Sequence, residues 1–243
     1  MQTAIERTID RLSHSAYVIA LTGAGISVES GIAQFRGKGG LWAKYDPEEY
    51  AHISAFRKDP GKVWNMLKEL HEIVSAANPN KAHYALAELE RLGKLKAVIT
   101  QNIDGLHQKA GSKNVIEFHG NGEYLVCMEC AQKALSSSVS LENLPPRCGC
   151  GGVYKPDVVL FGEPIPKEAL ERSYFEAQRA DAVLVIGTSA VVAPASHIPY
   201  IAKSAGAFIL EINPEETYFT GVIVDEFLPG SAGEILPKVV QGL

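Results

Sequence analysis

Short apolar runs alternate with amphipathic segments along most of this chain. The runs are mostly continuous and rich in Val and Ile, as in strands that are buried on both faces. The predicted strands are residues 17–22, 95–99, 115–118, 182–186, 208–212 and 222–224. The predicted helices begin near Ile5, after Asp59-Pro60 and after Asn78-Pro79-Asn80, and cover 166–179, 194–203 and 232–241. This alternation predicts an α/β fold in which helices cover both faces of a parallel sheet.

Most predicted strands end in polar or glycine residues. The clusters are Thr22-Gly23, Thr100-Gln101-Asn102, His119-Gly120, Gly187-Thr188-Ser189 and Glu211-Ile212-Asn213-Pro214. In open parallel sheets, ligands bind beyond the carboxyl ends of the strands. We therefore expect these clusters to converge on one crevice.

The stretch LTGAGISVESGIAQFRGKGGLW, residues 21–42, follows the first strand directly. Gly23 and Gly25 allow a tight turn and a close approach of backbone N–H groups to a ligand such as a pyrophosphate. Val28 stands at the third glycine position of the dinucleotide fingerprint, so the glycine pair alone also fits an ordinary strand-to-helix turn. Phe35 and Arg36 precede a glycine-rich segment, Gly37-Lys38-Gly39-Gly40. This composition is typical of a mobile loop over a phosphate-bearing ligand. It fits a surface loop with a buried Phe equally well.

Amides, a carboxylate and an imidazole follow two further strands. Asn102 and Asp104 can hold sugar hydroxyls and a carboxamide, although such residues more often cap a helix. His119 can remove a proton near neutral pH, although most histidines are packed or solvated. The predicted position of His119 faces the same crevice as the glycine turn, which favours a functional role for this histidine.

All four cysteines lie between residues 127 and 150, as the pairs Cys127/Cys130 and Cys148/Cys150. Clustered cysteines in an intracellular protein indicate a metal more than disulfides. Four thiolates leave no open position for water, so we predict a structural zinc site. A redox dithiol or disulfide pair is the competing interpretation. Residues 121–156 interrupt the strand–helix pattern as an insert.

Composition narrows the class of protein. The 243 residues carry a net charge of −5 and are 46% apolar. The acidic balance disfavours a nucleic-acid or membrane-surface binder. No apolar run is long enough to span a membrane, and the N-terminus lacks a signal-peptide core. We expect a soluble, cytoplasmic protein.

Several motifs together resemble the sirtuin family of NAD-dependent protein lysine deacylases. They are GAGISVESGIAQFRG, TQNIDGLH, FHG, the paired cysteines, KPDVVLFGE, GTS and INP, in that family's order from about residue 17 to 235. The resemblance implies a Rossmann-like parallel sheet with helices on both faces, plus a smaller zinc-binding and helical domain. The implied large domain is residues 1–36, 92–120 and 157–243, and the small domain is 37–91 and 121–156.

The resemblance also implies where ligands bind. The implied cofactor-binding residues are Gly23, Ala24, Gly25, Ser27, Glu29, Ile32, Phe35, Arg36, Trp42, Gln101, Asn102, Ile103, Asp104, His119, Gly187, Thr188, Ser189, Asn213, Pro214, Glu215 and Ala232. The implied zinc ligands are Cys127, Cys130, Cys148 and Cys150. Val158, Val159, Leu160, Phe161, Gly162 and Glu163 are implied to pair with an acyl-lysine peptide as an added strand.

His119 and Asn102 are the catalytic residues that the resemblance implies. His119 is the general base on the ribose of NAD, and the products are deacylated lysine, nicotinamide and 2′-O-acyl-ADP-ribose. One branch of the family, which favours acidic acyl groups, has a Tyr and an Arg where this chain has Leu67 and Leu70. We therefore expect acetyl or longer apolar acyl groups to be preferred to succinyl.

Two positions depart from the family pattern. Ala33 replaces a usual proline, and the spacing of Cys148 and Cys150 is one residue tighter than usual. Neither change removes a chemical group from the implied site. Two rival functions remain: transfer of ADP-ribose to protein, and non-catalytic binding of NAD or ADP-ribose.

Overall fold

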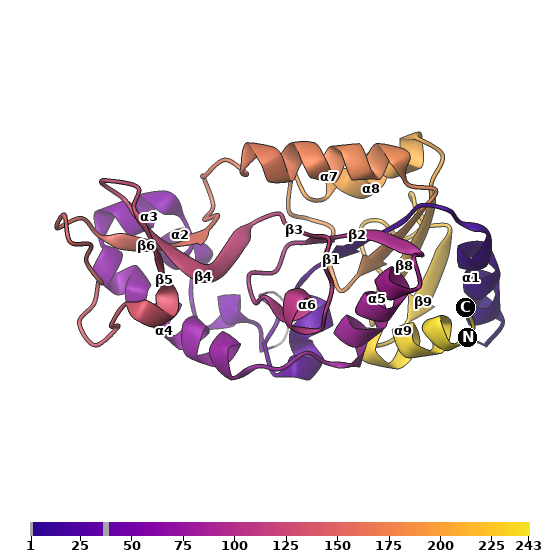
Figure 1. The fold of residues 1–243 in the computed structure, drawn as a ribbon, viewed down its shortest axis with the longest axis horizontal. Coiled ribbons are helices and arrows are strands. Elements are labelled where there is room, and N and C mark those ends of the chain that lie inside the picture. The colour runs from indigo at the N-terminus through magenta and orange to yellow at the C-terminus, as the bar shows by residue number, and fades with distance from the viewer. Residues whose placement is uncertain (1, 36–38) are drawn as a thin grey trace.

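A six-stranded parallel sheet forms the larger part of the molecule in this computed structural model, which describes residues 2–35 and 39–243 (Figure 1). Its strands are β1 (Val18–Thr22), β2 (Leu95–Thr100), β3 (Val115–Glu117), β7 (Ala182–Ile186), β8 (Phe208–Asn213) and β9 (Glu226–Pro229). The strand order is β3-β2-β1-β7-β8-β9, and each neighbouring pair is parallel. The order reverses direction at β1, so the carboxyl end of β1 lies at the topological switch point, where α/β sheets bind ligands.

Helices cover both faces of this sheet, as the continuous apolar strands predict (Figure 1). The helices are α1 (Gln2–His14), α5 (Lys81–Arg91), α6 (Leu106–Lys109), α7 (Lys167–Arg179), α8 (His197–Ser204) and α9 (Ala232–Gln241). Val18 and Ala20 of β1 pack in the core with residues of α1, α5 and α9. Ile19 and Leu21 point to the opposite face and pack with α7 and α8. Successive side chains of one strand thus fill two cores.

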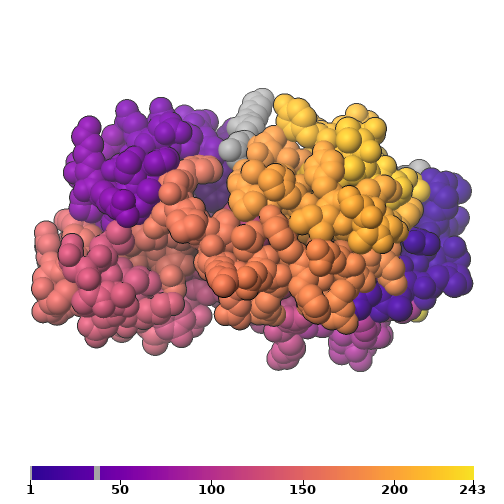
Figure 2. Space-filling view, turned by 90° about the horizontal axis from the view of Figure 1, so that it is seen from above, coloured from indigo at the N-terminus to yellow at the C-terminus, as the bar shows by residue number. Residues whose placement is uncertain are grey.

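A smaller module lies beside the sheet and is built from the two segments that leave it, one after β1 and one after β3 (Figures 1 and 2). Its helical elements are η2 (Leu41–Ala43), α2 (Pro47–Tyr50), α3 (Ile53–Lys58) and α4 (Pro60–Ala76). Its antiparallel sheet has the order β5-β4-β6, from β4 (Gly120–Cys127), β5 (Lys133–Leu135) and β6 (Tyr154–Val158), followed after β5 by η3 (Ser136–Ser138). The exact domain boundaries given above stay a prediction.

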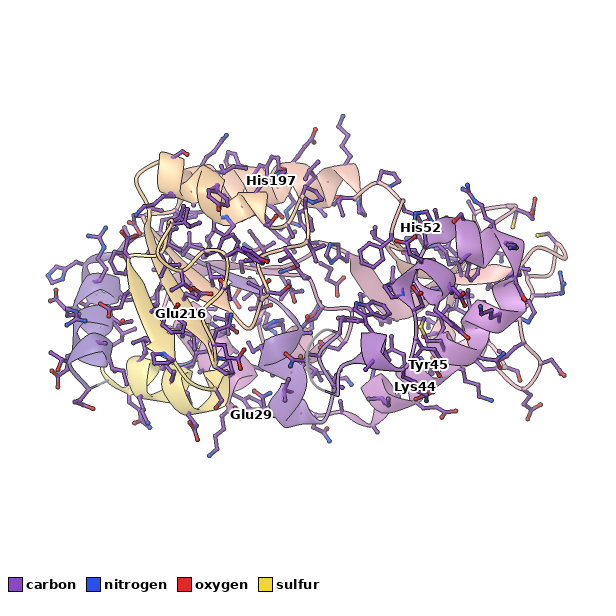
Figure 3. The ribbon with its side chains drawn as sticks, turned by 180° about the vertical axis from the view of Figure 1, so that it is seen from behind. Glu29, Lys44, Tyr45, His52, His197 and Glu216 are labelled. Carbon is purple, nitrogen blue, oxygen red and sulfur yellow. The ribbon has the colours of Figure 1, made fainter. Side chains whose placement is uncertain are left out.

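Buried contacts join the helical and strand parts of the small module. Trp64 of α4 is 1% exposed, and its Nε1 donates to the carbonyl of Tyr154 at 2.7 Å. Lys44 and Tyr45 both bond Glu69 of α4, which fixes the segment after η2 on that helix (Figure 3). Trp64 and Leu67 share one apolar core with Leu125 and Val158 of the small sheet. The two segments therefore fold as one unit.

Two expectations differ from the structure. Residues 222–224 do not form the last strand: Val222 is exposed in a turn after Phe219, and β9 begins at Glu226. The glycine turn leads into a 3-10 helix that is not among the predicted helices, η1 (Ala24–Ser30), which ends at Gly31 with a left-handed φ of 85°. A run of three apolar residues does not distinguish a strand from a turn, which explains the first error.

Within residues 2–35 and 39–243, the helices are too short or too polar to cross a bilayer.

Candidate functional site

A cleft of about 530 Å³ lies between the carboxyl edge of the large sheet and the small module. It collects residues from segments far apart in sequence, as the strand-end clusters predict. The predicted site residues that line it are Gly23, Ala24, Gly25, Phe35, Trp42, Leu67, Leu70, Gln101, Asn102, Ile103, His119, Val158, Val159, Leu160, Phe161, Gly162, Glu163, Gly187, Thr188 and Ser189. The crevice expected from the sequence is therefore present.

Gly23 and Gly25 are required by a contact between two strand ends. The N–H of Gly25 donates to the carbonyl of Gly187 at 2.8 Å, and the N–H of Gly23 donates to that of Ile186 at 3.0 Å. A Cβ on Gly25 would lie 2.6 Å from Cα of Gly187, which no side chain tolerates. Gly187 itself has a left-handed φ of 59°. These glycines thus bring the turns after β1 and β7 together at the floor of the cleft.

A buried polar network orients Asn102 and Asp104 beside this turn. Asn102 donates from Nδ2 to the carbonyl of Gly23 and to the hydroxyl of Ser27, both at 3.1 Å. The Ser27 hydroxyl donates to Oδ2 of Asp104 at 2.7 Å, and Oδ1 of Asp104 accepts from the N–H of Leu106. Ser27 is fully buried, and its hydroxyl links the side chains of Asn102 and Asp104.

Gln101 and Asn213 link neighbouring strand ends through Thr188. Gln101 donates from Nε2 to the Thr188 hydroxyl at 2.9 Å, and Asn213 donates from Nδ2 to the Thr188 carbonyl at 2.8 Å. The ends of β2, β7 and β8 are thereby held in register at the rim of the cleft.

His119 lies at the wall of the cleft, in the turn between β3 and β4. Its Nδ1 is 3.1 Å from the carbonyl oxygen of Gln101. A carbonyl can only accept, so Nδ1 carries the proton and Nε2 keeps its lone pair. Burial lowers the pKa of His119 below its ordinary value, partly opposed by the bond to Gln101. The ring is therefore neutral at pH 7 and able to accept a proton through Nε2.

Two buried histidines lie behind the polar network. Nε2 of His107 is 2.9 Å from the hydroxyl of Thr22, which donates to the hydroxyl of Thr100. That hydroxyl accepts the N–H of Asn102. The rings of His83 and His107 meet edge to face at 4.9 Å. Burial lowers the pKa of His83 to about 4 and that of His107 to about 3.

The low pKa of His107 predicts a pH-dependent stability. The pKa of His107 is lower in the folded than in the unfolded protein, so its contribution to the free energy of unfolding is complete above about pH 6.5. Below that pH, the free energy of unfolding falls by about 1.4 kcal/mol per pH unit. We expect His107→Gln to flatten the dependence of urea-unfolding free energy on pH between 6.5 and 4, relative to the unmodified protein. His14→Gln, at an exposed position, is the matched control. Equal slopes in all three proteins would contradict this account.

An aromatic group closes one side of the cleft. Phe35 and Trp42 are 5.2 Å apart between ring centroids, and Trp42 and Phe161 are 6.4 Å apart. Nε1 of Trp42 is buried without a protein partner among the described residues. A buried N–H donor at the wall of a cleft favours a ligand acceptor there.

The four cysteines form one cluster in the small module. Their Sγ atoms all lie within 4.8 Å of one another, and three pairs are 3.4–3.7 Å apart. A tetrahedral Zn²⁺ with Zn–S bonds of about 2.3 Å places its sulfurs about 3.8 Å apart. The arrangement fits a closed four-thiolate zinc site, despite the tight spacing of Cys148 and Cys150. The zinc prediction agrees with this geometry, and the separations are too long for disulfides.

Other predicted site residues lie away from the cleft lining. Ile32 packs with Ala77 and Leu106, and Glu29 accepts the N–H of Gly233 at the start of α9 (Figure 3). Ser27 and Asp104 lie behind the lining, and the lining also omits Asn213, Pro214, Glu215 and Ala232. Arg36 lies outside the described residues. Binding roles for all of these stay predictions.

Sequence reasoning missed several lining residues. They are Gln34, Leu41, Ala51, Met66, Pro164, Ile165, Leu170, Val192, Ala193 and Pro194. Most are apolar residues in irregular segments, where no periodicity or motif distinguishes a lining residue from a packed one. Ile165 precedes the predicted helix 166–179 and Leu170 lies within it, so the apolar face of that helix could have identified them as candidates.

Comparisons with known proteins agree with this site. The Sir2 family model matches residues 23–194. An NAD-dependent protein deacylase of Pyrococcus abyssi is 52% identical over 95% of this chain and 94% of its own. A Sir2 homologue solved as an NAD complex is 49% identical, with a TM-score of 0.90 over 97% of this chain and 92% of that one. A Sir2 structure with deacetylated p53 peptide and 3′-O-acetyl-ADP-ribose is 37% identical, with a TM-score of 0.94 over 98% and 99%. The chain described here therefore belongs to the Sir2 family.

Proposed function

We propose that this chain is an NAD-dependent protein lysine deacylase, in which His119 is the general base. One observation carries the assignment: a neutral imidazole, the Asn102 amide and the glycine turn line a single cleft that the segment 158–163 also borders. A cytoplasmic location stays a prediction of the sequence.

NAD would bind at the floor of this cleft. The turn at Gly23–Gly25 and the end of β7 would hold its phosphates, and Asn102 with Asp104 would hold the nicotinamide ribose and carboxamide. When bound, NAD supplies an electrophilic ribose carbon and nicotinamide as the leaving group. Gln101, Thr188 and Asn213 keep the surrounding strand ends in register.

His119 moves the proton that acyl transfer requires. Its Nε2 accepts a proton from a hydroxyl in the cleft, because Nδ1–H is already donated to the Gln101 carbonyl. That carbonyl also stabilises the imidazolium form that results. The walls formed by Phe35, Trp42 and Phe161 limit the access of water to the reacting atoms.

The acyl-lysine peptide would lie along residues 158–163, where most backbone groups are already bonded within the protein. The N–H of Val159 donates to the His119 carbonyl, and the N–H of Phe161 donates to that of Ala51. In the described part of the chain, the Val159 carbonyl and both backbone groups of Gly162 are without a partner. An added peptide strand would therefore bond the free backbone groups of Val159 and Gly162, and the side chains of the peptide would contact Phe161.

The acyl group would point toward Leu67 and Leu70. Both line the cleft and a second cavity of about 520 Å³, which also contacts Trp64, Val74 and Leu125. The residues that line both spaces are Leu67, Leu70, Ile103 and Val158, all of them apolar, so an aliphatic acyl chain placed there would contact apolar side chains.

This environment predicts acyl selectivity. A succinyl carboxylate beside Leu67 and Leu70 would be buried without a cation, which costs several kcal/mol. We expect kcat/KM for a succinyl peptide to be at least about 100-fold below that for the matched acetyl peptide. Peptides of one sequence with acetyl, succinyl and myristoyl groups make the comparison. A faster reaction with the succinyl peptide would contradict the prediction.

The products distinguish deacylation from ADP-ribosyl transfer, because both reactions break the same glycosidic bond. Mass spectrometry after incubation with NAD and an acetylated peptide should find free lysine peptide and O-acetyl-ADP-ribose in equal amounts. Protein or peptide that carries ADP-ribose, with the acetyl group retained, would overturn the proposal in favour of transfer. Unchanged NAD would favour a non-catalytic binder.

A further inference from the structure

Lys155 is a buried cation that the proposed mechanism does not use. It lies on β6, is 8% exposed and does not line the cleft. Its Nζ donates to the Val158 carbonyl at 2.6 Å, to the Pro156 carbonyl at 3.2 Å and to Oε2 of Glu163 at 2.9 Å. An ammonium has three donors, so each one has an acceptor. A lysine is rarely buried in this way without a specific partner.

Glu163 extends this contact to the segment at the peptide side of the cleft. The same oxygen, Oε2, accepts the N–H of Leu160 at 2.9 Å. The N–H of Glu163 donates in return to the Leu160 carbonyl at 3.0 Å. The Glu163 carboxylate thus links Lys155 of β6 to the turn at residues 160–163.

Gly162 shows that this turn has little freedom. Its φ is +82°, and a Cβ there would lie 2.7 Å from the ring of His52, which Figure 3 labels on the small module. Phe161 on one side of it bonds both Ala51 and Ile53, and Val159 bonds His119. The Lys155–Glu163 pair therefore acts on a segment that touches the proposed base at one end and the helical module at the other.

We propose that Lys155 is a positioning residue for the substrate peptide: its ion pair with Glu163 holds residues 158–163 in the conformation that leaves Val159 and Gly162 free to pair with an acyl-lysine strand. This inference rests on the proposed function. Because Lys155 touches neither the glycine turn nor Asn102, its loss should impair peptide binding and leave NAD binding intact.

The first test separates the two substrates. In Lys155→Met, we expect the KM for an acetyl-lysine peptide to rise about tenfold or more, as for loss of one partner of a buried charge pair. The KM for NAD at saturating peptide should change by less than about threefold, because a change of that size corresponds to less free energy than one typical hydrogen bond contributes. Lys155→Arg keeps the cation and should recover most of the peptide affinity. An unchanged peptide KM in Lys155→Met overturns the proposal.

A neighbouring surface pair provides a matched control. Lys133 and Asp157 form an ion pair at 2.7 Å between β5 and β6, and their side chains are 61% and 40% exposed. Lys133→Met removes a lysine of the same small sheet without touching residues 158–163. It should leave both KM values unchanged. A rise equal to that of Lys155→Met would show a general effect of charge loss and would overturn the proposal.

A double variant separates positioning from stability. Lys155→Met alone leaves the Glu163 carboxylate unpaired and is expected to lower the unfolding midpoint, whereas Lys155→Met/Glu163→Met replaces the pair by apolar groups, which is often neutral for stability. We expect the double variant to regain the midpoint while its peptide KM stays high. Recovery of both quantities together overturns the positioning role. Failure of the unmodified protein to deacylate any peptide would instead reject the proposed function.

Discussion

His119→Ala should lose about 10²–10⁴-fold in turnover, because the variant lacks the base that accepts the hydroxyl proton. The loss should fall on kcat for the acetyl-lysine peptide. NAD binding and zinc content should persist, since the ring of His119 bonds only the Gln101 carbonyl among the described residues and the zinc cluster lies in the small module. Steady-state rates of deacetylation, with NAD affinity from calorimetry, make this measurement.

The pH profile provides a second readout for the same residue. His119 must be neutral to act as a base, so activity should fall with acidification through its pKa. Burial lowers that pKa, and the acidic limb of kcat/KM should therefore lie below the ordinary imidazole range. The residual activity of His119→Ala should lack this limb. Normal turnover in the variant would remove His119 from the mechanism.

Removal of zinc should abolish deacylation, by more than about 100-fold, because metal binding at such sites supplies folding free energy of about 10–16 kcal/mol in isolated zinc-finger peptides. Cys127 and Cys148 are buried in the same apolar core as Leu125 and Val158, so loss of the metal should disorder the small sheet. β4 starts at Gly120, directly after His119, and the site would lose its alignment. Chelation followed by dialysis, with rates and zinc content measured, tests this.

Readdition of Zn²⁺ should restore both the zinc content, at one ion per cysteine cluster, and the rate. Cys130→Ser, at an exposed ligand, should show the same loss without chelator. Full activity of the zinc-free protein would show that the four thiols do not support the site.

The sequence predicts the large sheet well because most of its strands are nearly continuous apolar runs. Val18–Thr22 and Ala182–Ile186 are fully buried, and such runs admit few other structures. Four of the five strand-end clusters contribute to the cleft as predicted, since parallel strands bring their carboxyl ends to one edge, whereas Asn213 and Pro214 lie outside its lining. The pattern fails at residues 222–224, where three apolar residues form a turn, and at the antiparallel strands β4 and β5, which carry no clear alternation of apolar and polar residues.

Only the site residues that belong to sequence motifs could be predicted. Gly25 and His119 were located, but the sequence does not show that Gly25 faces Gly187 or that Nδ1 of His119 is donated to a carbonyl. Lys155 is adjacent to a proline, and only the fold shows that its ammonium is buried against Glu163. Contacts between segments far apart in sequence decide these points, and local patterns do not encode them.

The most direct measurement is the release of nicotinamide from NAD by the purified protein, with an acetyl-lysine peptide and with the same peptide unacetylated. If the imidazole of residue 119 serves acyl transfer, nicotinamide should appear only with the acetylated peptide, in step with the free lysine form. Equal release with both peptides, or release without deacetylation, would contradict the assignment of this cleft to lysine deacylation.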